Sequence, residues 1–419
     1  MKSTMLLAVV VVVLSLAWGS GVVSAIEGNI GANKACSSDV QKFCKDVKPG
    51  GGRIVECLKS HQSELCDACS SKLTKGKSLK EENQKRVNSP LGIAVGIYQP
   101  QKHTYNGLAI DRYTKEVGKK PAFAWLPMTW QRLDGSYWQF DAQMLDEFRT
   151  RGIMPGLNWD PSKGSTESYT DRQKAINQPE FSWKQIISGR HDEYITQFAK
   201  DAAAYHYPFI LRILHEMDGR WYPWGYSVNG NTNPADYVTA WTHIVDIFRK
   251  ENATNVQFVW CPSVLNPDRI QKYGATLKQV YPGDNYVDWV ALDGYSNPQN
   301  GWRSLQDEFK PSYDFITSFS ARPMILFEVG SMEDPADPMA RANWITQGFL
   351  TTIPSQLPKV KVAVWFNSKD GSGRDYRLQT SPNALAAWKQ VVSNPLYQGT
   401  LVNRNSRRQE RSLSTGAER

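Results

Sequence analysis

The sequence predicts an α/β fold: a (β/α)8 TIM barrel that follows a small α-helical hairpin stapled by disulfides. Eight short apolar runs alternate with amphipathic segments across residues 90–397, and strand alternating with helix favours parallel pairing. Eight strands over about 310 residues fit an eight-fold barrel with insertions. A doubly wound open sheet is the alternative, but no glycine fingerprint supports a dinucleotide-binding version of it.

The N-terminus has the pattern of a signal peptide, which we expect over residues 1–25. Lys2 precedes the apolar stretch "MLLAVVVVVLSLAW", and small residues lead to a cleavage site near Ala25. An uncleaved membrane anchor is the alternative, although the apolar run is short for a span. We therefore expect a secreted, extracellular protein without membrane contact after cleavage. Disulfides persist in that compartment, and Asn252 then starts an N-glycosylation triplet.

Five of the six cysteines mark residues 26–75 as a module too small for a large core. "SSDVQKFCKDV" and "RIVECLKSHQSELCDACSSKL" have helical apolar spacing, and "KPGGGR" separates them. In an antiparallel hairpin the pairing is nested, with Cys44 bonded to Cys57 near the turn and Cys36 to Cys69 at the open end. Cys66 is left over. A zinc site is the alternative use of these cysteines, and secretion argues against it.

The cysteine-rich stretch "CSSDVQKFCKDV…CLKSHQSELCDAC" resembles the repeat of the Golgi apparatus protein family. Cys66 is an addition to that four-cysteine pattern. The sequence leaves open whether Cys66 pairs with the distant Cys261 and what the module binds.

Neither the charge nor the linker points to a nucleotide or nucleic-acid partner. The formal net charge is +8, and part of it lies in residues 398–419, which lack apolar periodicity and are predicted to be a disordered basic tail. No basic recognition helix accompanies this charge. Residues 76–89 are expected to be a linker. The nearby "GKS" is not a phosphate-binding loop, because Ser71 stands where the motif needs glycine.

The eight expected strands each end in polar or aromatic residues: "GIAVGIYQ", "AFAWLPMTW", "IMPGLNWDP", "FILRILHEMDG", "VQFVWCPS", "WVALDGYS", "PMILFEVGS" and "VKVAVWFNS". Helical spacing lies between them, as in "FDAQMLDEFRTRG", "EYITQFAKDAAAYH" and "PADYVTAWTHIVDIFRKE". Sites of TIM barrels form at the C-terminal ends of the strands, so the residues that end these runs are the candidates.

Two glutamates and several aromatic residues stand at these strand ends. Glu216 follows the fourth run, Tyr295 is in the sixth, Glu328 in the seventh and Trp365 in the eighth. Glycoside cleavage needs one carboxylic acid to protonate the leaving oxygen. A second carboxylate must attack the sugar carbon or activate water. Aromatic faces stack on sugar rings. The set therefore indicates a glycan cleft with two reacting carboxyl groups.

Strand alternation suggests how these carboxyl groups differ. Alternation places four residues on one face of the fourth run: Ile210, Arg212, Leu214 and Glu216. On one face of the seventh run it groups Met324, Leu326 and Glu328. If these faces point into the barrel, Arg212 is a buried cation that needs a carboxylate, and Glu328 supplies it. Arg212 then keeps Glu328 ionised, and the charge of Glu328 raises the pKa of Glu216. This predicts Glu216 as the acid and Glu328 as the nucleophile.

"RILHEMDGRWYPWG" together with the later "FEVGS" resembles glycoside hydrolase family 26 from about Pro90 to Tyr397. The resemblance implies a retaining mechanism without a metal or organic cofactor, with Glu216 as acid/base and Glu328 as nucleophile. Four further matches follow from it: His215 beside the acid/base, Tyr295 as hydrogen-bond donor to the nucleophile, and Trp221 and Trp365 as sugar-contacting rings.

One residue departs from the family pattern, which usually has Asn where this chain has Asp218. Because Asp218 is two residues from Glu216 and expected on the opposite face, we expect it to have a small effect on the acid/base. "KDGSGRDYR" faintly resembles a calcium loop, but a glycine-rich substrate loop is favoured, and we assign no metal.

The sequence therefore predicts a monomeric, secreted retaining endo-β-glycanase that acts on hemicellulose, with β-1,4-mannan as the first choice of substrate. The predicted site consists of Glu216 and Glu328 as catalytic residues, with His215, Trp221, Tyr295, Trp365 and Arg212 as substrate-binding residues. Mixed-linkage β-1,3-1,4-glucan and β-1,3-xylan are the alternative substrates. A non-catalytic carbohydrate-binding barrel is the alternative from another class.

Overall fold

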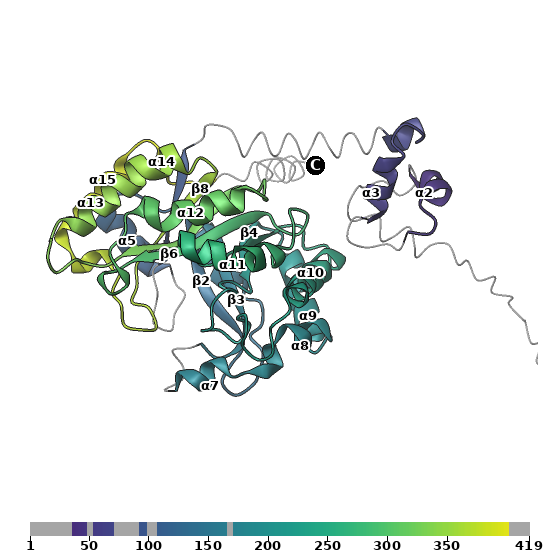
Figure 1. Cartoon of the computed structure of the whole chain (residues 1–419), viewed down its shortest axis with the longest axis horizontal. Helices are drawn as coiled ribbons and strands as arrows, with labels where there is room; N and C mark the ends of the chain where they lie inside the picture. The colour runs from purple at the N-terminus through teal and green to yellow at the C-terminus, as the bar shows by residue number, and fades with distance from the viewer. Residues whose placement is uncertain (1–35, 48–52, 71–91, 99–106, 166–170, 402–419) are drawn as a thin grey trace, which may run out of the picture. The chain divides into compact units, whose positions relative to one another are not determined.

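The structure is a computed structural model, and it describes residues 36–47, 53–70, 92–98, 107–165 and 171–401. The chain divides into two compact units, Met1–Ser89 and Pro90–Arg419 (Figure 1). The expected signal peptide, the expected linker and most of the expected basic tail lie outside the described residues. The domain boundaries drawn from the sequence therefore stay predictions.

The first unit contains the predicted pair of helices, α2 (Ser37–Phe43) and α3 (Arg53–Ser60). Both predicted disulfides are confirmed: Cys36 is bonded to Cys69, and Cys44 to Cys57. The buried core beside them is small and includes Val40, Ile54 and Leu58. Cys66 is in neither disulfide and is exposed, and Cys261 is buried in the second unit.

The second unit is a closed parallel barrel, as predicted, and not an open sheet. Hydrogen bonding follows the order β2-β3-β4-β5-β6-β7-β8-β1, and pairing between β1 and β2 closes the ring. The strands are β1 (Ile93–Tyr98), β2 (Phe123–Gln131), β3 (Met154–Lys163), β4 (Phe209–Ile213), β5 (Val256–Trp260), β6 (Trp289–Ser296), β7 (Met324–Ser331) and β8 (Val360–Phe366). A short strand, β9 (Tyr397–Gln398), pairs with β1 outside the ring.

Helices connect the strands and surround the barrel (Figure 1). The longer ones are α5 (Leu108–Val117), α6 (Ala142–Arg149), α9 (Asp192–Tyr205), α10 (Pro234–Lys250), α11 (Pro267–Gln279), α12 (Leu305–Thr317), α13 (Ala340–Gln347) and α15 (Pro382–Ser393). Shorter ones lie in the connections: α7 (Arg172–Ile176), η2 (Pro179–Phe181), α8 (Trp183–Ile187), η3 (Pro298–Asn300), η4 (Gly348–Thr352), α14 (Ile353–Gln356) and η5 (Leu378–Thr380). Among the described residues, no helix has both the length and the apolar character that a membrane span requires.

Local sequence signals fix where three of these helices begin. Asn233, Asn266 and Ser381 each stand before a proline, and each side chain accepts a hydrogen bond from a backbone N–H of the first helical turn. Such caps satisfy donors that have no partner within the helix, and proline at the first position already has the helical φ. The capped ends of α10, α11 and α15 follow the loops at the C-terminal end of the barrel.

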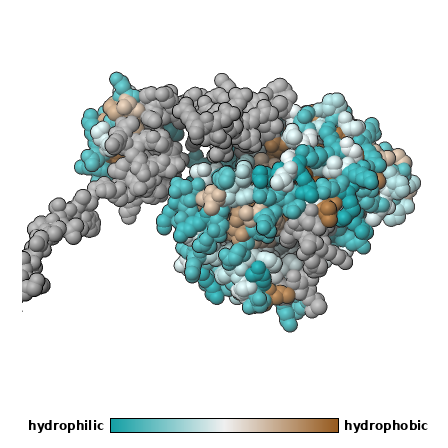
Figure 2. Space-filling model, turned by 180° about the vertical axis from the view of Figure 1, so that it is seen from behind, coloured by the Kyte–Doolittle hydropathy of each residue, from teal (hydrophilic) through white to brown (hydrophobic). Residues whose placement is uncertain are grey.

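Apolar side chains form two layers, one inside the barrel and one between the barrel and the helices. The inner layer includes Phe123, Ile210, Ile325 and Phe327. The outer layer is larger and includes alternate residues of the same strands. The barrel face that Figure 2 displays is mostly hydrophilic, as expected where surface helices turn their polar side outward.

Candidate active site

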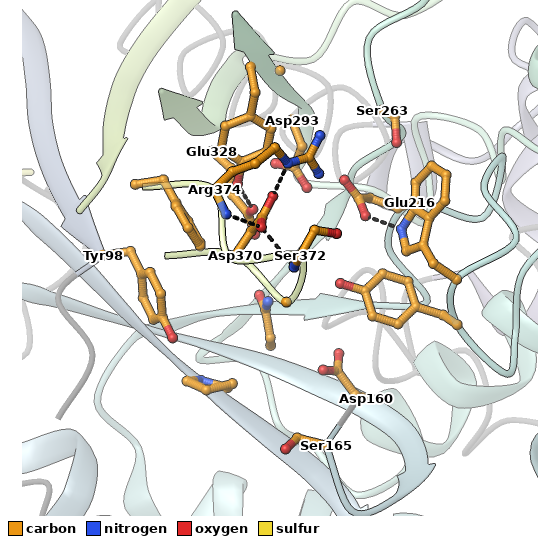
Figure 3. Close-up of a pocket in the computed structure, with 18 of the residues that line it drawn as sticks. Tyr98, Asp160, Ser165, Glu216, Ser263, Asp293, Glu328, Asp370, Ser372 and Arg374 are labelled. Atoms are coloured by element: carbon orange, nitrogen blue, oxygen red, sulfur yellow. Dashed lines mark hydrogen bonds and ion pairs between the residues drawn. The ribbon is translucent and has the colours of Figure 1, made fainter. Parts of the chain in front are cut away.

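A cavity of about 730 Å³ opens where the strands end, the position expected for a TIM barrel. Side chains from most of the strands and their following loops line it. Figure 3 shows Glu216 and Glu328 reaching the cavity from different walls, with Tyr98 across from Glu216. Glu216, Glu328, Tyr295 and Trp221, all four predicted from the sequence, line this cavity.

Glu216 sits just after β4, in backbone that has left the strand conformation. Leu214 and Glu216 both have positive φ, +46° and +47°, and the Glu216 N–H donates to the Cys261 carbonyl at 2.7 Å. Leu214 therefore packs in the outer layer, which corrects the prediction that it shares a face with Ile210 and Glu216. The turn redirects the Glu216 carboxyl group into the cavity.

The environment of Glu216 favours its protonated form. Burial, and next the negative charge of Glu328, raise the pKa of Glu216 to about 8, against the hydrogen bond that the Trp221 indole N–H donates to its Oε2. A carboxyl group that keeps its proton at neutral pH can act as a general acid.

The indole of Trp221 reaches Glu216 because residue 219 is glycine. A Cβ atom at Gly219 would come within 2.4 Å of the Trp221 ring, so a larger residue would displace the indole. Tyr222, which also lines the cavity, stacks on Trp224 with ring centroids 4.5 Å apart. The three aromatic residues after the acid therefore form one wall of the site.

Glu328 has the opposite environment, because two donors hold its carboxylate. The Arg212 guanidinium donates to Oε1 and the Tyr295 hydroxyl donates to Oε2. Charge-assisted hydrogen bonds of this kind stabilise the negative form of a carboxyl group. The predicted contact between Arg212 and Glu328 is present.

The geometry behind that contact differs from the prediction. Met324 and Leu326 point into the outer layer, whereas Ile325 and Phe327 point into the barrel. The pairing of β7 with β6 and with β8 shifts register at this point, so β7 contains one extra residue. This bulge turns Glu328 inward directly after the inward-facing Phe327.

Arg212 was assigned to substrate binding, and the structure corrects this assignment. Its side chain has no exposed surface and does not line the cavity. It pairs with Asp293 at 2.5 Å as well as with Glu328, donates to Asn158 at 2.5 Å, and lies 4.1 Å from the centre of the Phe327 ring. One buried cation that does not line the cavity therefore holds two carboxyl groups that do.

His215 also lies behind the cavity wall and does not line it, which corrects its assignment as a substrate-binding residue. The imidazole is buried, with its ring 4.7 Å from Tyr222 and 5.4 Å from Trp224. Its Nδ1 is 3.3 Å from Asp160, and burial lowers the pKa of His215. The neutral ring supports the aromatic wall from behind.

Trp365 is the third correction among the predicted site residues. It is fully buried in the outer layer, donates to the Tyr376 carbonyl at 3.0 Å and packs on Trp388. Residues next to one another in a strand face opposite sides, so the following residue, Phe366, lines the cavity instead.

Sequence reasoning missed several cavity residues. Phe366, Tyr98 and Trp125 form a stacked aromatic floor, with centroids 4.9 Å and 4.0 Å apart. Strict alternation on β8 would have pointed to Phe366. Asp370 and Arg374, paired at 2.5 Å, hold the loop after β8 at the cavity edge (Figure 3). That loop is the glycine-rich stretch that the sequence analysis assigned to substrate rather than calcium.

Asp218 is half-buried and lies two residues after the acid/base. Its Oδ1 accepts a hydrogen bond from the Ser263 N–H at 3.0 Å, while burial raises the pKa of Asp218 to about 6. Its charge is the last and smallest of the causes that raise the pKa of Glu216. In the described part of the chain, no cluster of His, Cys, Asp and Glu side chains has the arrangement of a metal site.

Comparisons with known proteins agree with these features. Residues 138–320 match the sequence model of glycosyl hydrolase family 26, and residues 29–66 match that of a cysteine-rich repeat. Glu216 lies inside the first match, and Glu328 lies beyond its end. The N-terminal stretch is also 46% identical over 44 residues to a Golgi apparatus protein 1 homolog from Caenorhabditis elegans, covering 10% of this chain and 4% of that protein.

An endoglucanase and a mannosidase are among the relatives to which this chain is similar. Endoglucanase H of Acetivibrio thermocellus is 38% identical over 230 residues, covering 52% of this chain and 24% of the relative. Mannan endo-1,4-β-mannosidase A and B of Caldalkalibacillus mannanilyticus is 32% identical over 163 residues, covering 38% of this chain and 28% of the relative. The chain thus spans about a quarter of the length of these relatives.

A solved structure, a family 26 β-mannanase from Bacteroides ovatus, shares the fold with a TM-score of 0.53 at 17% identity, covering 76% of this chain and 92% of that one. Within the barrel, residues 138–320 thus match the sequence pattern of glycosyl hydrolase family 26, and a match to a cysteine-rich repeat precedes them in the sequence.

Proposed function

We propose that this chain is a secreted, retaining endo-β-glycanase that hydrolyses hemicellulose. The observation that carries the proposal is the contrast between two carboxyl groups in one cavity. Glu216 is half-buried with a pKa raised to about 8, and Glu328 accepts hydrogen bonds from Arg212 and Tyr295. Two carboxyl groups with opposite environments are the requirement for acid-assisted glycoside cleavage.

The reaction runs in two steps. Glu216 donates its proton to the glycosidic oxygen while Glu328 attacks the anomeric carbon, which releases the leaving sugar and forms a covalent glycosyl-enzyme. Glu216, now a carboxylate, then takes a proton from water, and the hydroxide attacks the anomeric carbon and frees Glu328. Retention requires the two carboxyl groups to lie about 5–5.5 Å apart. The chemistry needs no cofactor.

The first candidate substrate is β-1,4-mannan, and the 32% identity to a mannan endo-1,4-β-mannosidase supports it. Mixed-linkage β-glucan is the second candidate. The similarity to the endoglucanase supports this candidate, because that match covers more of this chain and has a higher identity than the match to the mannosidase. The aromatic floor of Tyr98, Trp125 and Phe366 suits a sugar ring of either kind, because stacking uses the apolar faces that both sugars have.

Release of reducing sugar from mannan, lichenan and β-1,3-xylan tests the proposal. We expect release from mannan or lichenan by the wild type and a loss of at least about a thousand-fold in Glu328→Ala, since removing a nucleophile leaves only residual catalysis. Glu216→Ala should lose most activity on polymers. A folded protein that releases no sugar from any of the three would favour the non-catalytic carbohydrate-binding alternative.

A further inference from the structure

A group of cationic side chains surrounds an exposed aromatic ring beside the acid/base. Arg269, Lys272 and Tyr273 belong to α11, and Arg220 belongs to the loop that follows Glu216. We call these four residues the α11 patch. All four are exposed, and Tyr273, at 44% exposure, is one of the few exposed large aromatic residues among those that the structure describes.

The helix brings the patch together. Residues three and four apart share a helix face, so Arg269, Lys272 and Tyr273 are neighbours on α11. The Lys272 ammonium lies 5.1 Å from the centre of the Tyr273 ring. A hydrogen bond from Lys272, followed by the charges of Lys272, Arg269 and Arg220, lowers the pKa of Tyr273, so all three cations act on the same ring.

One member of the patch, Arg269, belongs to the cavity wall. Arg269 lines the cavity together with Ser263 and Glu216, and Figure 3 shows Ser263 beside Glu216. Within the described part of the chain, the three patch cations form no ion pair with a carboxylate, although the charge of Arg269 lowers the pKa of the half-buried Asp218. Three other cavity cations are paired: Arg303 with Glu308, Lys369 with Asp375 and Arg374 with Asp370.

We propose that the α11 patch is a subsite for an acidic sugar, in which Arg269 and Lys272 bind the carboxylate of a uronic acid and Tyr273 packs against its ring. Arginine and lysine supply charge-assisted donors to a carboxylate, and an exposed aromatic ring supplies the apolar face that a pyranose needs. The inference rests on the proposed glycanase function. It adds a preference for β-glycans that have uronic acid residues on the Glu216 side of the cleavage point.

The test compares neutral polymers with chemically matched acidic ones. Mannan and lichenan are each used unmodified and after partial oxidation of their C6 hydroxymethyl groups to carboxylates. We expect the wild type to have a kcat/KM about five-fold higher on the oxidised polymer at about 20 mM NaCl, and expect most of this preference to disappear at about 500 mM NaCl, because exposed ion pairs are modest and screened.

The double variant Arg269→Gln/Lys272→Gln should lose that preference, measured as the ratio of its kcat/KM on the oxidised polymer to its kcat/KM on the unmodified polymer. Lys278→Gln is the matched control, because Lys278 lies on the opposite side of α11, over Phe319. If the double variant keeps the preference, or if Lys278→Gln loses it equally, the subsite is refuted.

A failure of the proposed function can be told apart from a failure of the subsite. If no neutral polymer is cleaved, calorimetry with the oxidised oligosaccharides still reports binding. Weaker binding in the double variant than in Lys278→Gln then supports the subsite without the enzyme activity. Equal binding of a single-stranded DNA oligonucleotide and the oxidised oligosaccharide would show a general polyanion surface and overturn the sugar assignment.

Discussion

At the scale of single residues, the direction of the pKa of Glu216 follows from what surrounds its carboxyl group. Glu216 is half-buried and faces another negative charge, whereas Glu328 accepts from Arg212 and Tyr295. Burial raises the pKa of Glu216, whereas the hydrogen bond that the Trp221 N–H donates to the ionised carboxylate lowers it. Single substitutions at these contacts should therefore move the pH profile in predictable directions.

Trp221→Phe should move the alkaline limb of the kcat/KM profile to higher pH. Glu216 must be protonated to act, so wild-type activity should fall as the pH rises through about 8. Removing the indole N–H removes a stabiliser of the ionised form, and the pKa of Glu216 rises further. Trp365→Phe is the control, because Trp365 lies in the outer layer. A limb displaced toward lower pH in Trp221→Phe would contradict this assignment.

Asp218→Asn should stabilise the fold near neutral pH. The pKa of Asp218 is raised from 3.8 to about 6 in the folded protein, so its stabilising contribution is present below about pH 4 and is lost as the pH rises through about 6. The free energy of unfolding of the variant, relative to that of the wild type, should increase by up to about 3 kcal/mol from pH 4 to pH 7. Urea unfolding at both pH values measures this, with Asp268→Asn as the surface control.

The same substitution tests the predicted small effect of Asp218 on the acid/base. Removing this negative charge should shift the alkaline limb of the kcat/KM profile to lower pH, by less than about one pH unit. A larger displacement would mean that Asp218 controls the protonation of Glu216.

At the scale of elements, the bulge in β7 and the turn after β4 aim the two glutamates into one cavity. A regular β7 would turn Glu328 to the outer layer, because it follows the inward-facing Phe327. Arg212 reaches from β4 to Asp293 on β6 and Glu328 on β7. The carboxylates are therefore tied to one another through a single buried cation.

Arg212→Met should destabilise the barrel by about 3–5 kcal/mol, because Asp293 and Glu328 would be left as buried carboxyl groups without the cation that pairs with both. Denaturant unfolding at neutral pH measures the loss. Arg149→Met is a suitable control, since Arg149 pairs with Asp146 at the surface and should cost at most about 1 kcal/mol. Equal losses in the two variants would show that the Arg212 cluster has no special energetic role.

The sequence was sufficient for much of this arrangement. The eight apolar runs predicted the strands. Because a buried arginine needs a carboxylate partner, the sequence also predicted the Arg212–Glu328 pair. Strict alternation failed at Leu214, Met324 and Leu326, because a positive-φ turn and a one-residue bulge have no signature in apolar periodicity. Trp365 was misplaced for a related reason: its position at a strand end does not reveal which side it faces.

At the scale of the whole chain, two units with separate cores share one sequence. The N-terminal unit has a small apolar core and two disulfides, while the barrel has its own two-layered core. We therefore expect each unit to fold without the other.

The double variant Cys36→Ser/Cys69→Ser should unfold the N-terminal unit and leave catalysis by the barrel unchanged. The 33-residue separation of this disulfide corresponds to about 4 kcal/mol of loop-closure entropy, which a core of this size cannot replace. Limited proteolysis should remove residues before the barrel faster than in the wild type, while sugar release stays constant. Loss of activity in this variant would show that the two units depend on one another.

If Glu328 is the nucleophile, it forms a covalent bond to the sugar, and trapping that intermediate identifies the attacking residue. The enzyme is incubated with 2-deoxy-2-fluoro-β-mannosyl fluoride and, separately, with the glucosyl analogue, and its peptides are then mapped by mass spectrometry. We expect one added fluorosugar, on the peptide that contains Glu328. An adduct on another residue, or full activity with no adduct after exposure to both reagents, would contradict this expectation.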